Sequence, residues 1–80
     1  MKALPEEEQQ LINQLAKRIK SLRHQQGYTN YEHFANETGI SRTQYGRYET
    51  GNNMKFLTLA KVIKGMGLSW KEFFAEGFDD

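Results

Sequence analysis

The sequence contains no cysteine, a single proline and no long apolar run. The absence of cysteine excludes disulfide frameworks, thiolate zinc fingers, iron–sulfur clusters and cysteine nucleophiles. No apolar stretch approaches the roughly 20 residues that a membrane-spanning helix needs, and residues 1–10 are polar and acidic, unlike a signal peptide. We therefore expect a cytoplasmic protein that has no contact with a membrane.

Few residues could form a metal, cofactor or catalytic site. His24 and His33 lie nine residues apart with no third nitrogen or thiolate ligand nearby, which argues against a metal ion. Gly65 and Gly67 follow a helical pattern and not a strand, so they indicate a helix stop and not a dinucleotide-binding loop. No Ser, Asp or Glu is recognisably paired with a base. We expect neither an enzyme nor a cofactor nor a small-molecule ligand.

The charges are segregated along the chain, although the net charge is only +1. Residues 9–64 hold nine Lys or Arg and three Glu, a net charge of +6, whereas the two ends hold two Lys and seven Asp or Glu, a net charge of −5. A basic middle between acidic ends is typical of a protein that binds a polyanion. Chance clustering on a solvated surface explains the charges about equally well.

Apolar residues recur at spacings of three and four along nearly the whole chain, and no stretch alternates with a period of two. We therefore expect an all-α fold, and the length of 80 residues predicts a single domain over residues 1–80. The helices are predicted at about 5 to 25, 30 to 37, 41 to 50, 54 to 65 and 70 to 77. Residues 77–80 are expected to be frayed.

Capping residues mark the predicted helix boundaries. Gly39 and Gly51 are typical helix stops, and Asn52 and Asn53 offer an N-cap to the helix that follows. Three Ser or Thr residues stand three positions before Glu or Gln. This spacing predicts three capping boxes, formed by Thr29 with Glu32, Ser41 with Gln44, and Ser69 with Glu72.

The second and third predicted helices outline a helix-turn-helix. Both are short, only residues 38–40 separate them, and the motif has its core at about residues 30–50. Ala35 would let the two helices cross closely, and Gly39 would permit the positive φ of a tight turn.

From about Leu15 to Phe74 the chain resembles the Cro/cI-type (XRE-like) helix-turn-helix family. The likeness rests on four segments in the family's order, LAKRIKSLRHQQGY, FANETGISRTQYGRYETG, LTLAKVIKGMGLS and WKEFF. The resemblance implies a five-helix, lambda-repressor-like bundle whose third helix enters the major groove of DNA. The sequence departs from the family pattern at Tyr31, where Gln is usual, at Tyr45 and Tyr48, which replace aliphatic residues, and in a loop at residues 27–30 that is one residue longer.

The resemblance implies roles for individual residues. It assigns base contacts to Ser41, Arg42, Thr43 and Arg47. It also predicts contacts to the DNA backbone, which we place at Lys17, Asn30, Tyr31, Gln44, Thr50 and Asn52. It further implies a structural ion pair between Arg23 and Glu49, which would orient the third helix against the first.

The helical wheel of the third helix agrees with this assignment. Tyr45 and Tyr48 share one face, whereas the opposite arc holds two arginines and a threonine, at positions 42, 43 and 47. An arginine on this arc could pair with the O6 and N7 atoms of guanine. Gly46 lies in the same arc, where its missing side chain would let the backbone lie close to DNA. Lys17, Arg18 and Lys20 on the first helix would contribute at most uniform affinity for phosphates.

Large apolar residues recur at helical spacing near the end of the chain. They are Trp70, Phe73, Phe74 and Phe78. This is more apolar surface than one short helix must bury, so we expect part of it to line a homodimer interface. The alternative, that all four residues complete the core of the monomer, remains about equally well supported.

These observations predict a sequence-specific protein that binds double-stranded DNA, most plausibly a small prokaryotic transcriptional regulator that acts by occupying its operator. A second hypothesis is a protein-interaction or antitoxin-like module that uses the aromatic C-terminal helix and binds DNA only secondarily. RNA binding ranks third, because no basic and aromatic platform like those of RNA-binding modules is visible.

Overall fold

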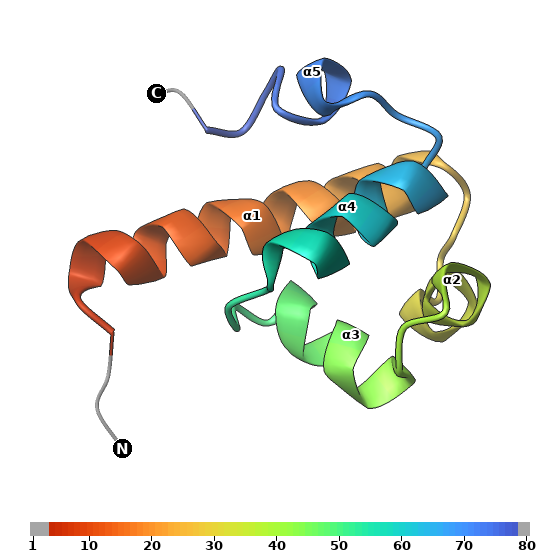
Figure 1. Cartoon of the computed structure of the whole chain (residues 1–80), viewed down its shortest axis with the longest axis horizontal. Coiled ribbons are helices and arrows are strands. Elements are labelled where there is room, and N and C mark those ends of the chain that lie inside the picture. Colours follow the sequence, from red (N-terminus) through yellow and green to blue (C-terminus); the bar gives the residue numbers. More distant parts are fainter. Residues whose placement is uncertain (1–3, 79–80) are drawn as a thin grey trace.

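The computed structural model describes residues 4–78, and this part of the chain forms five helices (Figure 1). They are α1 (Glu6–Gln25), α2 (Tyr31–Thr38), α3 (Arg42–Glu49), α4 (Phe56–Gly65) and α5 (Trp70–Phe73). Residues 4–78 contain no strand, so the predicted all-α fold is confirmed. Every helix begins within two residues of its predicted start, and only α5 is clearly shorter than predicted. No helix among the described residues is long and apolar enough to cross a membrane.

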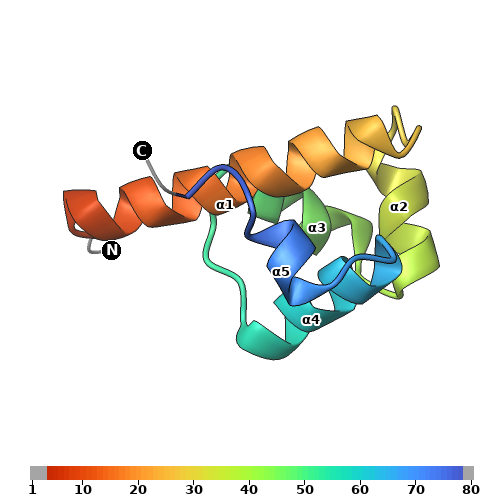
Figure 2. The ribbon, with the colours of Figure 1, turned by 90° about the horizontal axis from the view of Figure 1, so that it is seen from above.

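The long helix α1 runs along the whole molecule and the other four helices pack around it (Figure 1). In this view α3 lies below α1 and α4, whereas α5 lies above them. Figure 2, seen from above, places α5 over the space between α1 and α4. The helix predicted to read DNA and the aromatic C-terminal helix are therefore on opposite sides of the molecule.

The core forms where the first four helices meet. Phe34 and Ala35 of α2 are completely buried, as is Tyr45 of α3. The Phe34 ring lies 5.2 Å from that of Tyr28 and 5.3 Å from that of Tyr45, and Phe73 closes the core from the side of α5. These contacts fix α2 against α3, which is the arrangement that the predicted helix-turn-helix requires.

The predicted capping box is complete at α5, only its Ser41 half forms at α3, and the predicted caps of α2 and α4 are wrong. Ser69 and Glu72 form a reciprocal capping box at α5, with distances of 2.9 and 3.1 Å, and the Ser41 hydroxyl accepts from the backbone of Gln44. The backbone N–H and the hydroxyl of Ser69 also lower the pKa of Glu72, because both stabilise its carboxylate.

The start of α2 is capped by Asn30, whose side chain accepts from the backbone N–H of Glu32 at 2.7 Å. The predicted box between Thr29 and Glu32 is therefore wrong, because Asn30 lies one residue closer to the helix. Asn52 does not cap α4 either. Its amide donates to the carbonyl oxygen of Arg47 at 3.0 Å, so it terminates α3, and α4 begins later without a side-chain cap.

Helix α5 ends at Phe73, and Arg18 of α1 caps its last carbonyl groups. The guanidinium donates to the carbonyl oxygens of Phe73 at 2.7 Å and of Glu72 at 3.0 Å. In a longer helix these oxygens would accept from residues 76 and 77. The chain instead folds back, and Phe78 is half-buried against the core, so the prediction of fraying is wrong for this residue. The end of the predicted tail, residues 79–80, lies outside the described residues.

Helices α2 and α4 approach each other at Gly65. A Cβ atom added there would lie 2.5 Å from the methyl carbon of Thr38, much closer than two carbon atoms can pack. The Thr38 hydroxyl donates to the carbonyl oxygen of Ala35 at 3.0 Å, which holds the side chain in this position. The missing side chain of Gly65 therefore sets how closely α4 packs on the helix-turn-helix.

We predict that Gly65→Ala destabilises the protein, although alanine favours a helix over glycine by about 1 kcal/mol. The added methyl group would collide with Thr38, and overpacking of this kind costs about 1 to 3 kcal/mol. In a Thr38→Ser background, which keeps the hydroxyl and removes the methyl group, the same change should increase stability. Urea unfolding of the four variants measures both effects. A similar destabilisation in both backgrounds would show that Thr38 is not the obstacle.

Candidate DNA-binding interface

The turn between α2 and α3 has the geometry that the sequence predicts. Gly39 adopts a positive φ of 78°, which a residue without Cβ adopts readily. The backbone N–H of Ile40 donates to the carbonyl oxygen of Ala35 at 3.1 Å and closes the turn. Tyr45 and Tyr48 point into the core, as the helical wheel predicts, so the opposite face of α3 is left to solvent.

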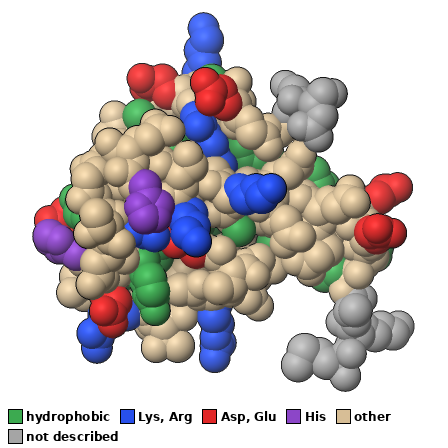
Figure 3. All heavy atoms as spheres, turned by 180° about the vertical axis from the view of Figure 1, so that it is seen from behind, with side chains coloured by type: hydrophobic (Ala, Val, Ile, Leu, Met, Phe, Trp, Pro, Cys, Tyr) green, Lys and Arg blue, Asp and Glu red, His purple; other side chains and the backbone are tan. Residues whose placement is uncertain are grey.

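The residues predicted to contact bases all lie on this exposed face of α3 or at its N-cap. They are Ser41, Arg42, Thr43 and Arg47, and the exposed Gln44 stands among them. Three further predicted contacts, Asn30, Tyr31 and Asn52, are exposed at the start of α2 and in the loop after α3. Seen from behind, Lys and Arg side chains project at the lower and upper edges of the molecule, and acidic side chains lie at the end where α1 begins and also near both of these edges (Figure 3).

Two of the predicted phosphate ligands already use their donors at the end of α3. The Thr50 hydroxyl donates to the carbonyl oxygen of Arg47 at 2.8 Å, and the amide of Asn52 donates to the same oxygen. A phosphate accepts hydrogen bonds and does not donate them, so it would have to displace these contacts. Thr50 and Asn52 therefore serve first as caps of α3.

The position of Tyr31 corrects the interpretation of Gly46. A Cβ atom at Gly46 would lie 3.1 Å from both the ring and the hydroxyl oxygen of Tyr31, so the aromatic ring occupies the space that a side chain would fill. The prediction that Gly46 lets the backbone approach DNA is therefore wrong. Glycine at this position instead seats the exposed Tyr31 at the junction of α2 and α3. The sequence contained a signal for this contact, because Tyr31 stands where the family usually has Gln and Gly46 lies inside a short helix.

The structure brings Arg23 and Glu49 together in a bidentate ion pair between α1 and the end of α3. Nε and Nη2 of Arg23 lie 2.7 and 3.0 Å from the two carboxylate oxygens, and the side chains are only 4% and 7% exposed. The remaining nitrogen, Nη1, donates to the carbonyl oxygen of Tyr28 at 2.6 Å. The hydrogen bonds that Arg23 donates to the Glu49 carboxylate raise the pKa of Arg23 above its ordinary value.

The hydroxyl of Tyr45 is buried in the core without a hydrogen-bond partner among the described residues. Burial, and then the neighbouring Glu49 carboxylate, raise the pKa of Tyr45 far above its usual range. Tyr45 therefore stays neutral and contributes its ring to the packing of α3.

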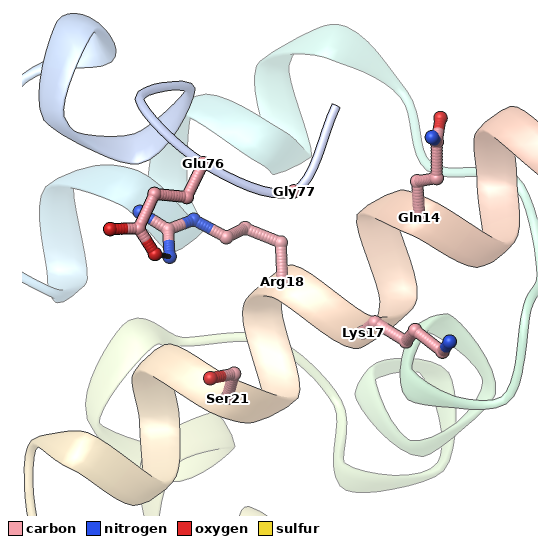
Figure 4. Close-up of a pocket in the computed structure, with 6 residues that line it drawn as sticks. All are labelled: Gln14, Lys17, Arg18, Ser21, Glu76 and Gly77. Carbon is pink, nitrogen blue, oxygen red and sulfur yellow. Dashed lines mark ion pairs between the residues drawn. The ribbon is translucent and has the colours of Figure 1, made fainter. Parts of the chain in front are cut away.

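Only part of the basic surface predicted on α1 is available to DNA. Lys17 and Lys20 are exposed and, with Thr50, line a shallow hollow between α1 and the end of α3. Arg18 instead turns toward the C-terminal segment and lies beside Glu76, with 3.9 Å between the charged groups (Figure 4). Because its guanidinium holds the end of α5, Arg18 is the least available of the three basic residues expected to contribute at most uniform affinity.

The predicted dimer residues divide into buried and exposed ones. Phe73 is completely buried in the core of the monomer, so its assignment to a dimer interface is wrong. Trp70 and Phe74 are 41% and 40% exposed, and Phe56 and Leu57 of α4 are 68% and 74% exposed. The ring of Trp70 stacks on those of Phe56 and Phe74, with centroid distances of 5.1 and 6.2 Å.

We call Phe56, Trp70 and Phe74 the aromatic strip. Neither Phe56 nor its neighbour Leu57 was predicted to lie in this exposed apolar surface. The sequence contained a signal for their exposure. Helix α4 begins with two adjacent large apolar residues, and neighbouring positions point in different directions, so the buried face of one helix does not readily accommodate both.

His24 and His33 take part in local contacts. Nε2 of His33 lies 3.4 Å from a carboxylate oxygen of Glu37, and His24 lies beside Arg23. Within residues 4–78 no three side chains of His, Cys, Asp or Glu are grouped so that they could hold a metal ion.

Two short helices with a tight glycine turn and an exposed polar face on the second define a helix-turn-helix domain, a class that binds DNA. A family model described as helix-turn-helix matches residues 19–73, which include all of α2 to α5. The chain therefore belongs to the Cro/cI-type (XRE-like) helix-turn-helix family, a family of DNA-binding regulators. No curated protein and no solved structure gives a match.

We predict that Glu49→Gln strongly destabilises the protein. Removal of one charge leaves Arg23 buried without its counterion, which costs about 3 to 5 kcal/mol, so the Tm should fall by roughly 10 °C or more. Glu76→Gln is the matched control, because that carboxylate faces Arg18 at 3.9 Å and is 82% exposed. It should change stability by less than about 1 kcal/mol. An unchanged Tm for Glu49→Gln would contradict a structural role for the pair.

Proposed function

We propose that this protein is a sequence-specific transcriptional regulator that occupies an operator in double-stranded DNA. The observation that carries the proposal is the division of α3 into a buried face, with Tyr45 and Tyr48, and an exposed face with two arginines. A short helix held from behind by its aromatic face can enter a major groove without losing contact with its own core. Regulation would then follow from occupancy, because a bound protein blocks or recruits the polymerase.

In this proposal, the exposed residues of α3 contact bases and those of α1 contact phosphates. Arg42 and Arg47 each offer two parallel donors to the O6 and N7 atoms of guanine, and the methyl group of Thr43 is suited to contact with thymine. Lys17 and Lys20 stand on α1, beside the end of α3, where they approach phosphates. Phosphate contacts release counterions and position the protein, but they carry no sequence information.

We predict that Arg47→Ala lowers affinity for a preferred duplex by about 1 to 3 kcal/mol and for a scrambled duplex much less. A preferred duplex is first selected from a random library, and both duplexes are then titrated at the same salt concentration. Lys17→Ala serves as the contrasting variant. It should weaken both complexes alike and lower the slope of log affinity against log salt by about one. An equal loss on both duplexes for Arg47→Ala would make Arg47 a backbone contact.

We further propose that the protein binds DNA as a homodimer. One α3 covers only a few base pairs, and helix-turn-helix dimers place their two reading helices about 34 Å apart. The aromatic strip, together with Leu57, provides exposed apolar surface of the kind found at the centre of protein interfaces. A second copy seated on the aromatic strip, where α4 and α5 meet, would leave the exposed face of α3 uncovered.

We predict that Phe56→Ser with Trp70→Ser abolishes the dimer without unfolding the monomer, because both side chains are already partly solvated. Sedimentation with a palindromic duplex should give two protein chains per duplex for the wild type and one for the variant. Leu11→Ser is the control, since Leu11 is an equally exposed apolar residue on α1, far from α5 in the sequence. One chain per duplex for the wild type at saturating protein would refute the dimer.

The aromatic strip also supports a second candidate function, a protein-interaction or antitoxin-like module. Such a module would dock another protein on Phe56 and Trp70 and bind DNA only weakly. Salt separates the two functions, because binding of a polyanion weakens steeply as salt rises, whereas aromatic docking does not. Binding to heterologous duplex that is insensitive to salt would favour the second function.

A further inference from the structure

Glu32 is the one acidic residue among the side chains that form the proposed DNA interface at α2 and α3. Its Oε2 atom lies 3.3 Å from Nη1 of Arg42, across the turn between the two helices. The side chains of Arg42 and Glu32 are 61% and 45% exposed, so this pair contributes little to folding. The sequence pattern assigned Glu32 only to a helix cap, and Asn30 provides that cap instead.

The contact engages only one nitrogen of the Arg42 guanidinium. A guanidinium holds five N–H donors in one plane, and Nε with Nη2 forms an edge that fits two acceptors at once. Arg23 uses its donors in this way: Nε and Nη2 bind both oxygens of Glu49, while Nη1 binds a separate carbonyl oxygen. Arg42 has its Nη1 bound to Glu32, so the edge that fits O6 and N7 of guanine remains available.

The same carboxylate opposes contacts that carry no sequence information. An arginine at this position without an acidic neighbour would bind any phosphate. Such phosphate contacts strengthen binding to all DNA sequences alike. A phosphate at the same edge of the Arg42 guanidinium is repelled by the negative charge of Glu32, whereas a guanine, which is neutral, is not. A guanine in front of the available edge leaves the ion pair in place. The pair of Arg42 and Glu32 therefore favours contact of Arg42 with guanine and disfavours its contact with phosphates.

We infer that Glu32 determines sequence specificity as a positioning residue, because it holds Arg42 for base recognition. The inference rests on the proposed function, since it requires α3 to read DNA. It adds a residue of α2 that touches no base and still sets which bases are preferred.

The test is a double-mutant cycle on the ratio of affinities for the preferred and the scrambled duplex at one salt concentration. Glu32→Gln should tighten binding to the scrambled duplex and reduce the ratio by about three- to tenfold, because Arg42 is no longer ordered before binding. In an Arg42→Ala background Glu32→Gln should leave the ratio unchanged, since repulsion between Glu32 and phosphates acts on both duplexes alike. Glu37→Gln, which removes the same charge from the same helix away from Arg42, should also leave the ratio unchanged.

Each outcome of the cycle has a separate meaning. An unchanged ratio for Glu32→Gln in the wild-type background overturns the inference and leaves the proposed function intact. A reduced ratio that persists without Arg42 also overturns it, because Glu32 would then read a base itself, as a carboxylate does at the amino group of cytosine. A wild-type protein that distinguishes no duplex from another overturns the proposed function, and this inference with it.

Discussion

The buried ion pair of Arg23 and Glu49 is the contact on which the orientation of α3 depends. The Arg23 guanidinium, which belongs to α1, joins three parts of the chain. It donates to Glu49 at the end of α3 and to the carbonyl oxygen of Tyr28, which precedes α2. A buried charge is tolerated only when its partners are all present. The pair therefore holds the helix-turn-helix at one angle to α1, and the chain has no easy alternative arrangement of these helices.

A second arginine on α1 performs a comparable function on the other side of the molecule. Arg18 caps the last carbonyl groups of α5, which ends after one turn, and Phe78 packs back onto the core. Phe73 is buried and Trp70 stays at the surface, stacked on Phe56 of α4. The two arginines thus bind elements on different sides of the molecule, because α3 lies below and α5 above α1 and α4 in Figure 1.

The polar surface of α3 is organised by residues of other segments. Tyr31 fills the space above Gly46, Glu32 holds one nitrogen of Arg42, and Asn52 caps the end of the helix. Of the side chains expected to read bases, Arg42 is thereby held from α2, and the end of the α3 backbone is held from the loop that follows. Such ordering before binding reduces the conformational entropy that a complex must lose.

The sequence by itself determined the helices, the turn and the face of α3 that is left to solvent. These features depend on local signals: apolar spacings of three and four, the Ser caps of α3 and α5, and Gly39 with its positive φ. These local signals suffice because each involves residues within a few positions of one another. The pairing of Arg23 with Glu49, which lie far apart in the sequence, was instead implied by the family resemblance.

Only the tertiary structure decided which distant groups these residues meet. Periodicity placed Phe73 and Trp70 on one short helix, but the packing of α5 on the core buried one and exposed the other. Charge alone made Arg18 look like a phosphate ligand, whereas the nearby end of α5 offered it two carbonyl oxygens. A long side chain can reach many possible partners. It binds the unsatisfied polar group that the fold brings within hydrogen-bond distance.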